Sequence, residues 1–143
     1  MFFQGTSALT LDGKGRLTVS ARHREVLLAN TGGALTLTKH PHGCLLLLPR
    51  PAWERLRENL MKLPMSAEGW RRVFIGHAVD VEMDNAARIN LTPELKAAAG
   101  LDREVLLRGN GGHLELWDPR RWATYEAEAT VGPMPEAIAG FVF

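Results

Sequence analysis

The chain has 143 residues, and its 17 lysines and arginines against 16 aspartates and glutamates give a formal net charge of only +1. This length is enough to bury a core, but the near-neutral charge supplies no global field that would direct the chain to nucleic acid or to a membrane, so any basic site must be local. No apolar run approaches the ~18 residues of a membrane span. The single cysteine, Cys44, lies among leucines, which predicts a buried thiol and a reducing, cytoplasmic compartment.

The first predicted elements are two short strands joined by a turn. Apolar and polar residues alternate over 9–12 and again over 17–20, which is the pattern of half-buried strands. The Asp-Gly-Lys-Gly stretch between them predicts a tight turn, because glycine tolerates positive φ. Ser20 is then expected to cap a short helix over residues 21–29, which the Asn-Thr-Gly-Gly run at 30–33 ends.

Two further strands and a helix are predicted to complete the first half. The strands cover residues 35–38 and 44–48 and are joined by a short loop. A helix follows from Pro51, with apolar side chains at helical spacing as far as Leu63. A linking helix is predicted over 66–74, with three large apolar side chains on one face, namely Trp70, Val73 and Phe74.

The second half repeats this order. Residues 83–96 are a degenerate copy of residues 11–24, with the two turn aspartates and the two turn arginines each 72 positions apart. Further strands are predicted at 79–83, 105–107 and 114–116, and a last helix is capped by Asp118 and contains Trp122, which lies 69 positions after Trp53. The apolar tail, 131–143, shows no clear periodicity.

The repeat predicts a tandem duplication of one small module. We divide the chain into a first module at 1–65, a linking helix at 66–76 and a second module at 77–143. Neither half is long enough to bury its strands well alone, so the halves are expected to pack on one another or to intertwine.

Motifs for enzyme chemistry are lacking in the sequence. It contains no Gly-x-Ser-x-Gly, no Walker phosphate loop and no Cys-x-x-Cys, which predicts a protein without catalytic activity or a cofactor. His40 and His42 flank Pro41 in a predicted loop and could share a metal, but His77 and His113 lie far along the chain. We therefore expect exposed loop histidines and no metal site.

The Asp-x-x-x-Arg turn has two interpretations that do not exclude each other. In the first, Asp12 and Asp84 accept backbone hydrogen bonds or pair with the arginine of their own turn, and so brace it. In the second, basic side chains of the turn and of the following helix form a face that contacts phosphates and base edges. In the first copy these side chains are Lys14, Arg16, Arg22 and Arg24.

The stretch from Leu11 to Leu17, and its copy from Met83 to Ile89, resemble the MraZ family, and the resemblance covers essentially the whole chain. It implies an α+β, mainly β fold: two tandem AbrB-like ββαββ swapped-hairpin modules that form a pseudo-two-fold barrel with short flanking helices. It also implies a bacterial transcriptional regulator of the cell-division and cell-wall gene cluster, binding repeated double-stranded DNA boxes upstream of its own operon. Homo-oligomeric rings and association with the nucleoid are further implications.

The resemblance also implies the DNA-contacting residues. The arginine of the turn and a basic residue in the next helix fall on Arg16 and Arg24 in the first copy and on Arg88 and Lys96 in the second. The window of the first copy holds four basic and two acidic side chains, a net charge of +2, whereas that of the second holds two of each. We therefore expect the first copy to supply the main DNA face. The alternative is a non-catalytic structural or protein-interaction module, such as an antitoxin-like assembly partner.

Overall fold

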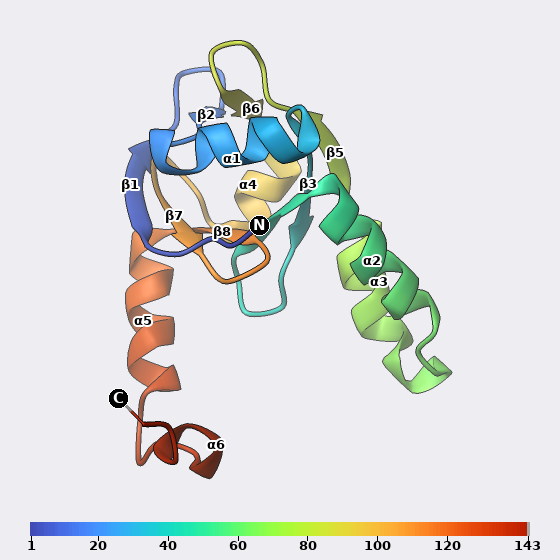
Figure 1. Ribbon diagram of the computed structural model, residues 1–143, viewed down its shortest axis with the longest axis vertical. Helices are drawn as coiled ribbons and strands as arrows, with labels where there is room; N and C mark the ends of the chain where they lie inside the picture. The colour runs from blue at the N-terminus through green and yellow to red at the C-terminus, as the bar shows by residue number, and fades with distance from the viewer. Residues whose placement is uncertain (143) are drawn as a thin grey trace.

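The computed structural model describes residues 1–142 of the chain (Figure 1). The first half contains β1 (Thr6–Thr10), β2 (Arg16–Thr18), α1 (Ala21–Thr31), β3 (Ala34–Lys39), β4 (Leu45–Pro49) and α2 (Arg50–Met61). The 3₁₀ turn η1 (Met65–Ala67) and helix α3 (Glu68–Gly76) follow. The second half contains β5 (Val79–Glu82), β6 (Arg88–Asn90), α4 (Pro93–Ala99), β7 (Glu104–Gly109), β8 (Leu114–Trp117), α5 (Pro119–Ala129) and α6 (Glu136–Ala139).

The predicted order of elements is confirmed, with corrections at several ends. Helix α1 extends to Thr31, and the left-handed Gly32 ends it. Ser20 stands at the N-cap of α1, but its side chain makes no capping hydrogen bond there; its hydroxyl oxygen instead accepts from the hydroxyl of Ser7 at 3.2 Å. Asp118 does cap α5, accepting from the backbone N–H of Arg121. The tail contains the short helix α6, which the sequence pattern did not reveal.

The strands of the two halves are interleaved in one antiparallel sheet of order β1-β7-β8-β4-β3-β5. The outer strands are exchanged, because β1 of the first half pairs with β7 of the second, and β5 of the second half pairs with β3 of the first. The sheet is open between β1 and β5, and the separate β2–β6 ribbon contacts both of these edges. The predicted α+β class and the intertwining of the halves are therefore confirmed.

The main core fills the space between the sheet, the ribbon, α1 and α4. Alternate side chains of the strands point into it, and Leu37, Leu47, Leu107 and Leu116 are fully buried there. Leu17 and Ile89 close the core from the ribbon. Cys44 is buried as predicted. Within the described residues, no helix is long and apolar enough to cross a membrane.

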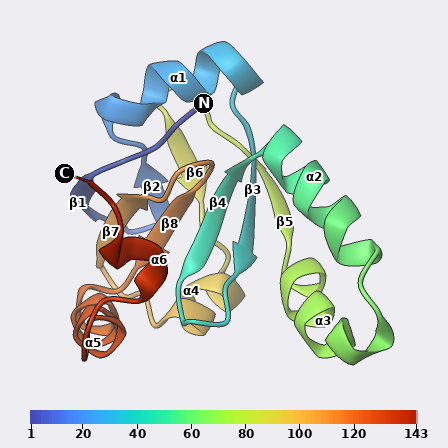
Figure 2. The ribbon, with the colours of Figure 1, turned by 60° about the horizontal axis from the view of Figure 1, so that its bottom comes forward.

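Two helical extensions project from the outer side of the sheet, opposite the ribbon (Figures 1 and 2). In the first, α3 packs back along α2, and together they cover a small cluster built on Leu46, Leu48 and Trp53. On α3, Trp70 is 57% exposed, while Phe74 joins the cluster. In the second, α5 stands without such a partner.

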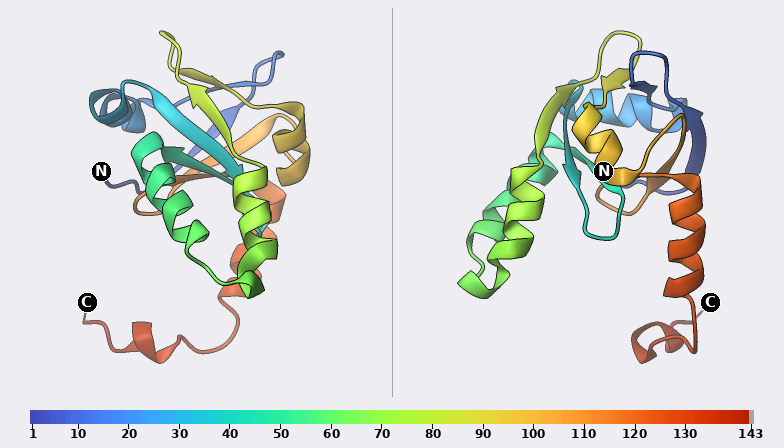
Figure 3. Two further views of the ribbon diagram at one scale, coloured as in Figure 1. Left: turned by 90° about the vertical axis from the view of Figure 1, so that its right-hand side faces the viewer. Right: turned by 180° about the vertical axis from the view of Figure 1, so that it is seen from behind.

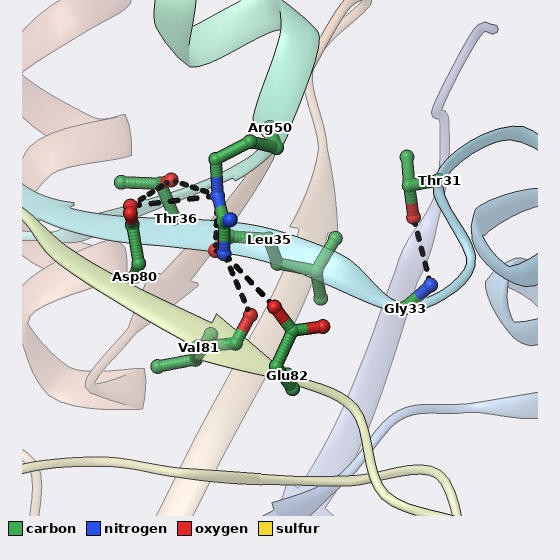
Figure 4. Close-up of polar contacts among 8 residues, drawn as sticks. All are labelled: Thr31, Gly33, Leu35, Thr36, Arg50, Asp80, Val81 and Glu82. Atoms are coloured by element: carbon green, nitrogen blue, oxygen red, sulfur yellow. Dashed lines mark hydrogen bonds and ion pairs between the residues drawn. The ribbon is translucent and has the colours of Figure 1, made fainter.

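Arg50, at the start of α2, ties the exchanged edge strand β5 to the sheet (Figure 4). Its guanidinium donates to the carbonyl oxygens of Leu35 at 2.7 Å and Val81 at 3.2 Å, and lies 3.4 Å from the carboxylate of Asp80. Asp80 also accepts from the hydroxyl of Thr36 at 2.8 Å. One side chain thus joins three elements.

Because the strands of both halves share one sheet, the division of the chain at 66–76 stays a prediction.

Candidate nucleic-acid interface

The first Asp-x-x-x-Arg turn is held by the carboxylate of Asp12. One oxygen accepts from the backbone N–H groups of Lys14 and Arg16, both at 2.9 Å, and the other accepts from the Nε–H of Arg16 at 2.7 Å. Three hydrogen bonds from two residues fix both the turn and the direction of the arginine side chain.

The second turn reproduces this arrangement with a different sequence. The carboxylate of Asp84 accepts from the backbone N–H groups of Ala86 and Arg88 at 2.8 and 2.9 Å, and from the Nε–H of Arg88 at 2.9 Å. The residue before each arginine has positive φ, 76° at Gly15 and 60° at Ala87. The backbone of the turn is therefore the same whether or not glycine supplies the left-handed position.

The hydrogen bonds keep both aspartates ionised. The backbone N–H of Arg16 is the largest influence on Asp12, and with the other donors it outweighs partial desolvation and lowers the pKa of the carboxyl to about 2. The backbone N–H of Arg88 lowers the pKa of Asp84 in the same way. Each arginine is thus paired with a carboxylate that stays charged at neutral pH.

The β2–β6 ribbon brings the two arginines together. Leu17 lies opposite Ile89 at its centre, and both side chains are buried. The alternate residues face outward: Arg16, Thr18, Arg88 and Asn90. Arg16 pairs with Asn90 and Thr18 with Arg88, so the two arginines are diagonal neighbours, with roughly 7–8 Å between positions on the ribbon.

Thr18 and Asn90 are exposed residues of this face that sequence reasoning missed. The signal was present, since the alternation around buried Leu17 and Ile89 places both on the outward side. What was missing was the knowledge that β2 and β6 are partners.

The basic residue of α4 lies beside the turn of the other half, and that of α1 bonds to a residue that contacts the other turn through its backbone. A Cβ built on Gly15 would lie 3.8 Å from Nζ of Lys96, so the cation of α4 borders the first turn. Arg24 of α1 donates to the carbonyl oxygen of Val19 at 2.9 Å, and the N–H of Val19 donates to the carbonyl oxygen of Ala87 in the second turn. Figure 3 shows α1 and α4 on opposite sides of the ribbon, with both turns projecting between them.

The expectation that the first copy supplies the main DNA face stays a prediction. The two sequence windows, with net charges of +2 and zero, do not form two surfaces. Their turns share one ribbon, and Lys96 of the second half borders the turn of the first. The structure brings Arg16, Arg88, Lys96 and Arg24 into one region.

The remaining predicted residues differ in how freely they are displayed. Lys14 is exposed at the tip of the first turn. Arg22 is exposed on α1 but lies against Gly5 of the N-terminal arm, away from the tips of the turns. Arg24 is partly buried, and its Nε has no hydrogen-bond partner among the described residues.

The structure places the histidines in different surroundings. No group of three or more metal-ligating side chains is placed to hold an ion in residues 1–142. His42 is exposed as predicted, but His40 is half-buried and packs against Phe74, so its predicted exposure is wrong. His113, distant in sequence, lines the same pocket as His40, because β4 and β8 are neighbours.

The exchanged strands and the repeated Asp-x-x-x-Arg turn define a class of protein. It is a duplicated swapped-hairpin protein whose two-stranded ribbon carries two arginines, each paired with an aspartate. The family profile "MraZ protein, putative antitoxin-like" matches the chain twice, over residues 2–73 and 74–136. A relative from Variovorax paradoxus (strain S110), named "Transcriptional regulator MraZ", is 57% identical over 141 residues, covering 99% of each chain. Relatives of the same name from Leptothrix cholodnii and Verminephrobacter eiseniae are 57% and 52% identical, covering 99% of this chain and 97% and 99% of their own. The chain therefore belongs to the MraZ family.

Proposed function

We propose that the chain is a transcriptional regulator that binds double-stranded DNA through the β2–β6 ribbon and its two turns. The observation that carries this proposal is the display of Arg16 and Arg88 side by side on one rigid ribbon, each held in place by its own aspartate. The relatives' name, "Transcriptional regulator MraZ", supports the regulatory role. It favours this function over a protein-interaction module.

The geometry explains how the arginines would read DNA. Each uses its Nε–H for the carboxylate, so within the described residues the terminal nitrogens of both guanidiniums make no hydrogen bond. A guanidinium held in this way presents its outer edge as a fork that fits guanine or a phosphate. The major groove accepts a two-stranded ribbon, so both forks would enter one groove together.

Other residues of the face would have supporting roles. Asn90 projects from the ribbon beside Arg16, and its amide matches the edge of adenine. Lys14 and Lys96 would contact the phosphates on the side of the first turn, and Arg22 and Arg24 those near α1. These contacts set position and affinity, while the ribbon residues set sequence preference.

We extend the proposal to assembly and cellular setting. The protein would act without catalysis in the cytoplasm, on the nucleoid, as a ring-shaped homo-oligomer that binds repeated boxes upstream of its own operon. One ribbon has a modest charge, so affinity would come from repetition: linked sites raise avidity by ~10² to 10⁴ when box spacing matches subunit spacing.

A salt titration tests the proposal. A labelled fragment of the gene's own upstream region is titrated with protein at rising salt, beside a shuffled fragment of equal length and composition. We expect preferential binding of the native fragment, with log K falling against log salt by about 0.9 for each phosphate neutralised. Fragments with one box should bind far more weakly than fragments with several. Equal binding of native and shuffled DNA, or none at low salt, would refute sequence-specific regulation.

A further inference from the structure

The repeat continues beyond α5 into the tail. At the step of 69 positions that relates Trp53 to Trp122, Pro64 and Met65 of the α2–α3 link match Pro133 and Met134. Val73 matches Val142 at the same step. The residues from Pro133 onward are therefore the second-half counterpart of η1 and α3. We call residues 133–142, the described part of this counterpart, the tail.

The two counterparts behave differently. In the first half, α3 packs on α2, and Phe74 joins a cluster with Leu46, Leu48 and Trp53, so Trp53 is only 3% exposed. In the second half, α5 stands alone and the tail leads away from it (Figures 1 and 3). Trp122, the counterpart of Trp53, remains partly exposed.

The place that a helix such as α3 would cover in the second half is open. Counterparts of the first-half cluster line a groove of about 340 Å³ beside α5; they are Glu115, Trp117, Trp122 and Tyr125. The ring centroids of Trp117 and Trp122 are 5.2 Å apart, and those of Trp117 and Tyr125 5.1 Å apart. The guanidinium carbon of Arg108 lies 3.7 Å from the centroid of Trp122.

The carboxylate in the groove needs no external partner. Burial alone would raise the pKa of Glu115, but hydrogen bonds from His113, Trp117 and Asn110 lower it to about 2. The carboxylate is therefore satisfied within the chain, and the rings of Trp117, Trp122 and Tyr125 offer apolar surface to an occupant.

The tail has matching apolar side chains that nothing in the described chain covers. Phe141 is 63% exposed and Val142 97%, and Met134 and Ile138 are exposed as well. The groove and the tail are two apolar surfaces in one molecule, and uncovered apolar surface of this kind marks interaction sites.

The bonds that hold α3 in place have no counterparts in the tail. Arg71 of α3 donates to the carbonyl oxygens of Leu60 and Leu63 at the end of α2, whereas its counterpart is Gly140. The hydroxyl of Thr38 donates to the carbonyl oxygen of Phe74, whereas the counterpart of Thr38 is Leu107. The tail is therefore not fixed to its own α5 and is available to another chain.

We infer that the apolar tail of one copy of this chain docks into the groove of a second copy and covers it, as α3 covers the cluster of the first half. The contact is head-to-tail, since the donor and acceptor surfaces differ, and such contacts repeat into a ring or an open chain. It rests on the assembly proposed above and gives it a contact surface. It does not involve the turns of the ribbon.

Two variants that are defective on opposite sides of the contact test the inference. The tail variant is Phe141→Asp with Val142→Asp, and the groove variant is Tyr125→Asp. Light scattering should show assembly of the wild-type chain and a single-chain mass for each variant alone. An equimolar mixture should form a complex of two chains and stop there, because the intact tail of the groove variant meets the intact groove of the tail variant.

Controls separate this outcome from misfolding. Leu28→Asp makes the same kind of change on α1, at an exposed apolar residue away from the groove, and should keep the wild-type mass. Circular dichroism checks each variant, and His42→Glu, at an exposed side chain that lines the groove, replaces Tyr125→Asp if that variant unfolds. Binding of single-box DNA should be unchanged in all of them.

Three results would overturn the inference. If either variant alone keeps the wild-type mass, the tail does not make the contact, although the proposed assembly stands. If both variants are single chains and their mixture stays so, the tail docks on its own chain. A single-chain mass for the wild type would refute this contact and the assembly together, leaving the DNA titration as an independent test.

Discussion

The two turns of the ribbon are alike in backbone and different in chemistry. Each is closed by an aspartate that accepts three hydrogen bonds, and each directs an arginine outward. The first carries Lys14 and Gly15 where the second carries Ala86 and Ala87. The two turns thus keep one structure with only the aspartate and the arginine in common, and the three residues between them differ in charge and strain.

Removal of the turn arginines should have the largest effect. Arg16→Ala and Arg88→Ala should each weaken binding of the upstream fragment by about 1–3 kcal/mol, because each loses a bidentate fork. Arg16→Ala should weaken binding more than Arg88→Ala, since Lys14 and Lys96 border the turn of Arg16. Fluorescence anisotropy at fixed salt measures both, with melting temperature recorded beside it.

Arg16→Lys and Arg88→Lys are the matched controls. They keep the charge but lose the fork and the Nε–H that the aspartate holds, so they should restore non-specific binding without restoring sequence preference. Loss of binding in Arg88→Ala alone, with Arg16→Ala unaffected, would contradict a shared ribbon face.

Exchanging the charge between the turns should have a smaller effect. Lys14→Ala should lower affinity uniformly across DNA sequences and reduce the salt slope by about 1, because one phosphate contact is lost. Ala86→Lys should raise affinity uniformly across DNA sequences and increase the salt slope by a similar amount. The slope of log K against log salt is the measurement, and an unchanged slope in both variants would place the turn tips away from the phosphates.

Exchanging the residues at positive φ should affect stability more than binding. Gly15→Ala should lower the free energy of unfolding by about 1 kcal/mol, because a side chain at φ 76° is strained. Ala87→Gly should raise it slightly, since φ is 60° there and strain is relieved at the expense of a small buried methyl group. Urea denaturation measures both; a stabilising Gly15→Ala would show that the positive φ carries no strain.

The pH dependence should show the smallest effect. The pKa of Asp12 is about 2 in the folded chain and about 3.8 when free, so its contribution to stability is present above pH 4 and lost as pH falls toward 2. Asp12→Asn should flatten the unfolding curve in this range. The salt dependence of the same curve should be weak, because the shift arises chiefly from backbone hydrogen bonds. An identical acid transition in Asp12→Asn would assign it to other carboxylates.

Much of the fold follows from local patterns in the sequence. Period-two alternation identifies the strands, and the repeated Asp-x-x-x-Arg spacing identifies both turns, because strand burial and turn geometry depend on neighbours within a few residues. Ser20 shows the limit of such reasoning. It occupies a capping position, yet its hydroxyl bonds with Ser7, which the folded chain brings beside it from β1.

The duplicated β-rich module and its two braced turns can be predicted from the sequence, since each of these features depends on residues that are close together in the chain. The partners of the strands are seen in the fold alone, because alternation shows which side chains are buried but not which strand lies beside them. That pairing places Arg16 next to Asn90 and carries Lys96 to the turn of the other half. The groove beside α5 is open as well, because the tail lacks the hydrogen bonds that hold α3 in the first half.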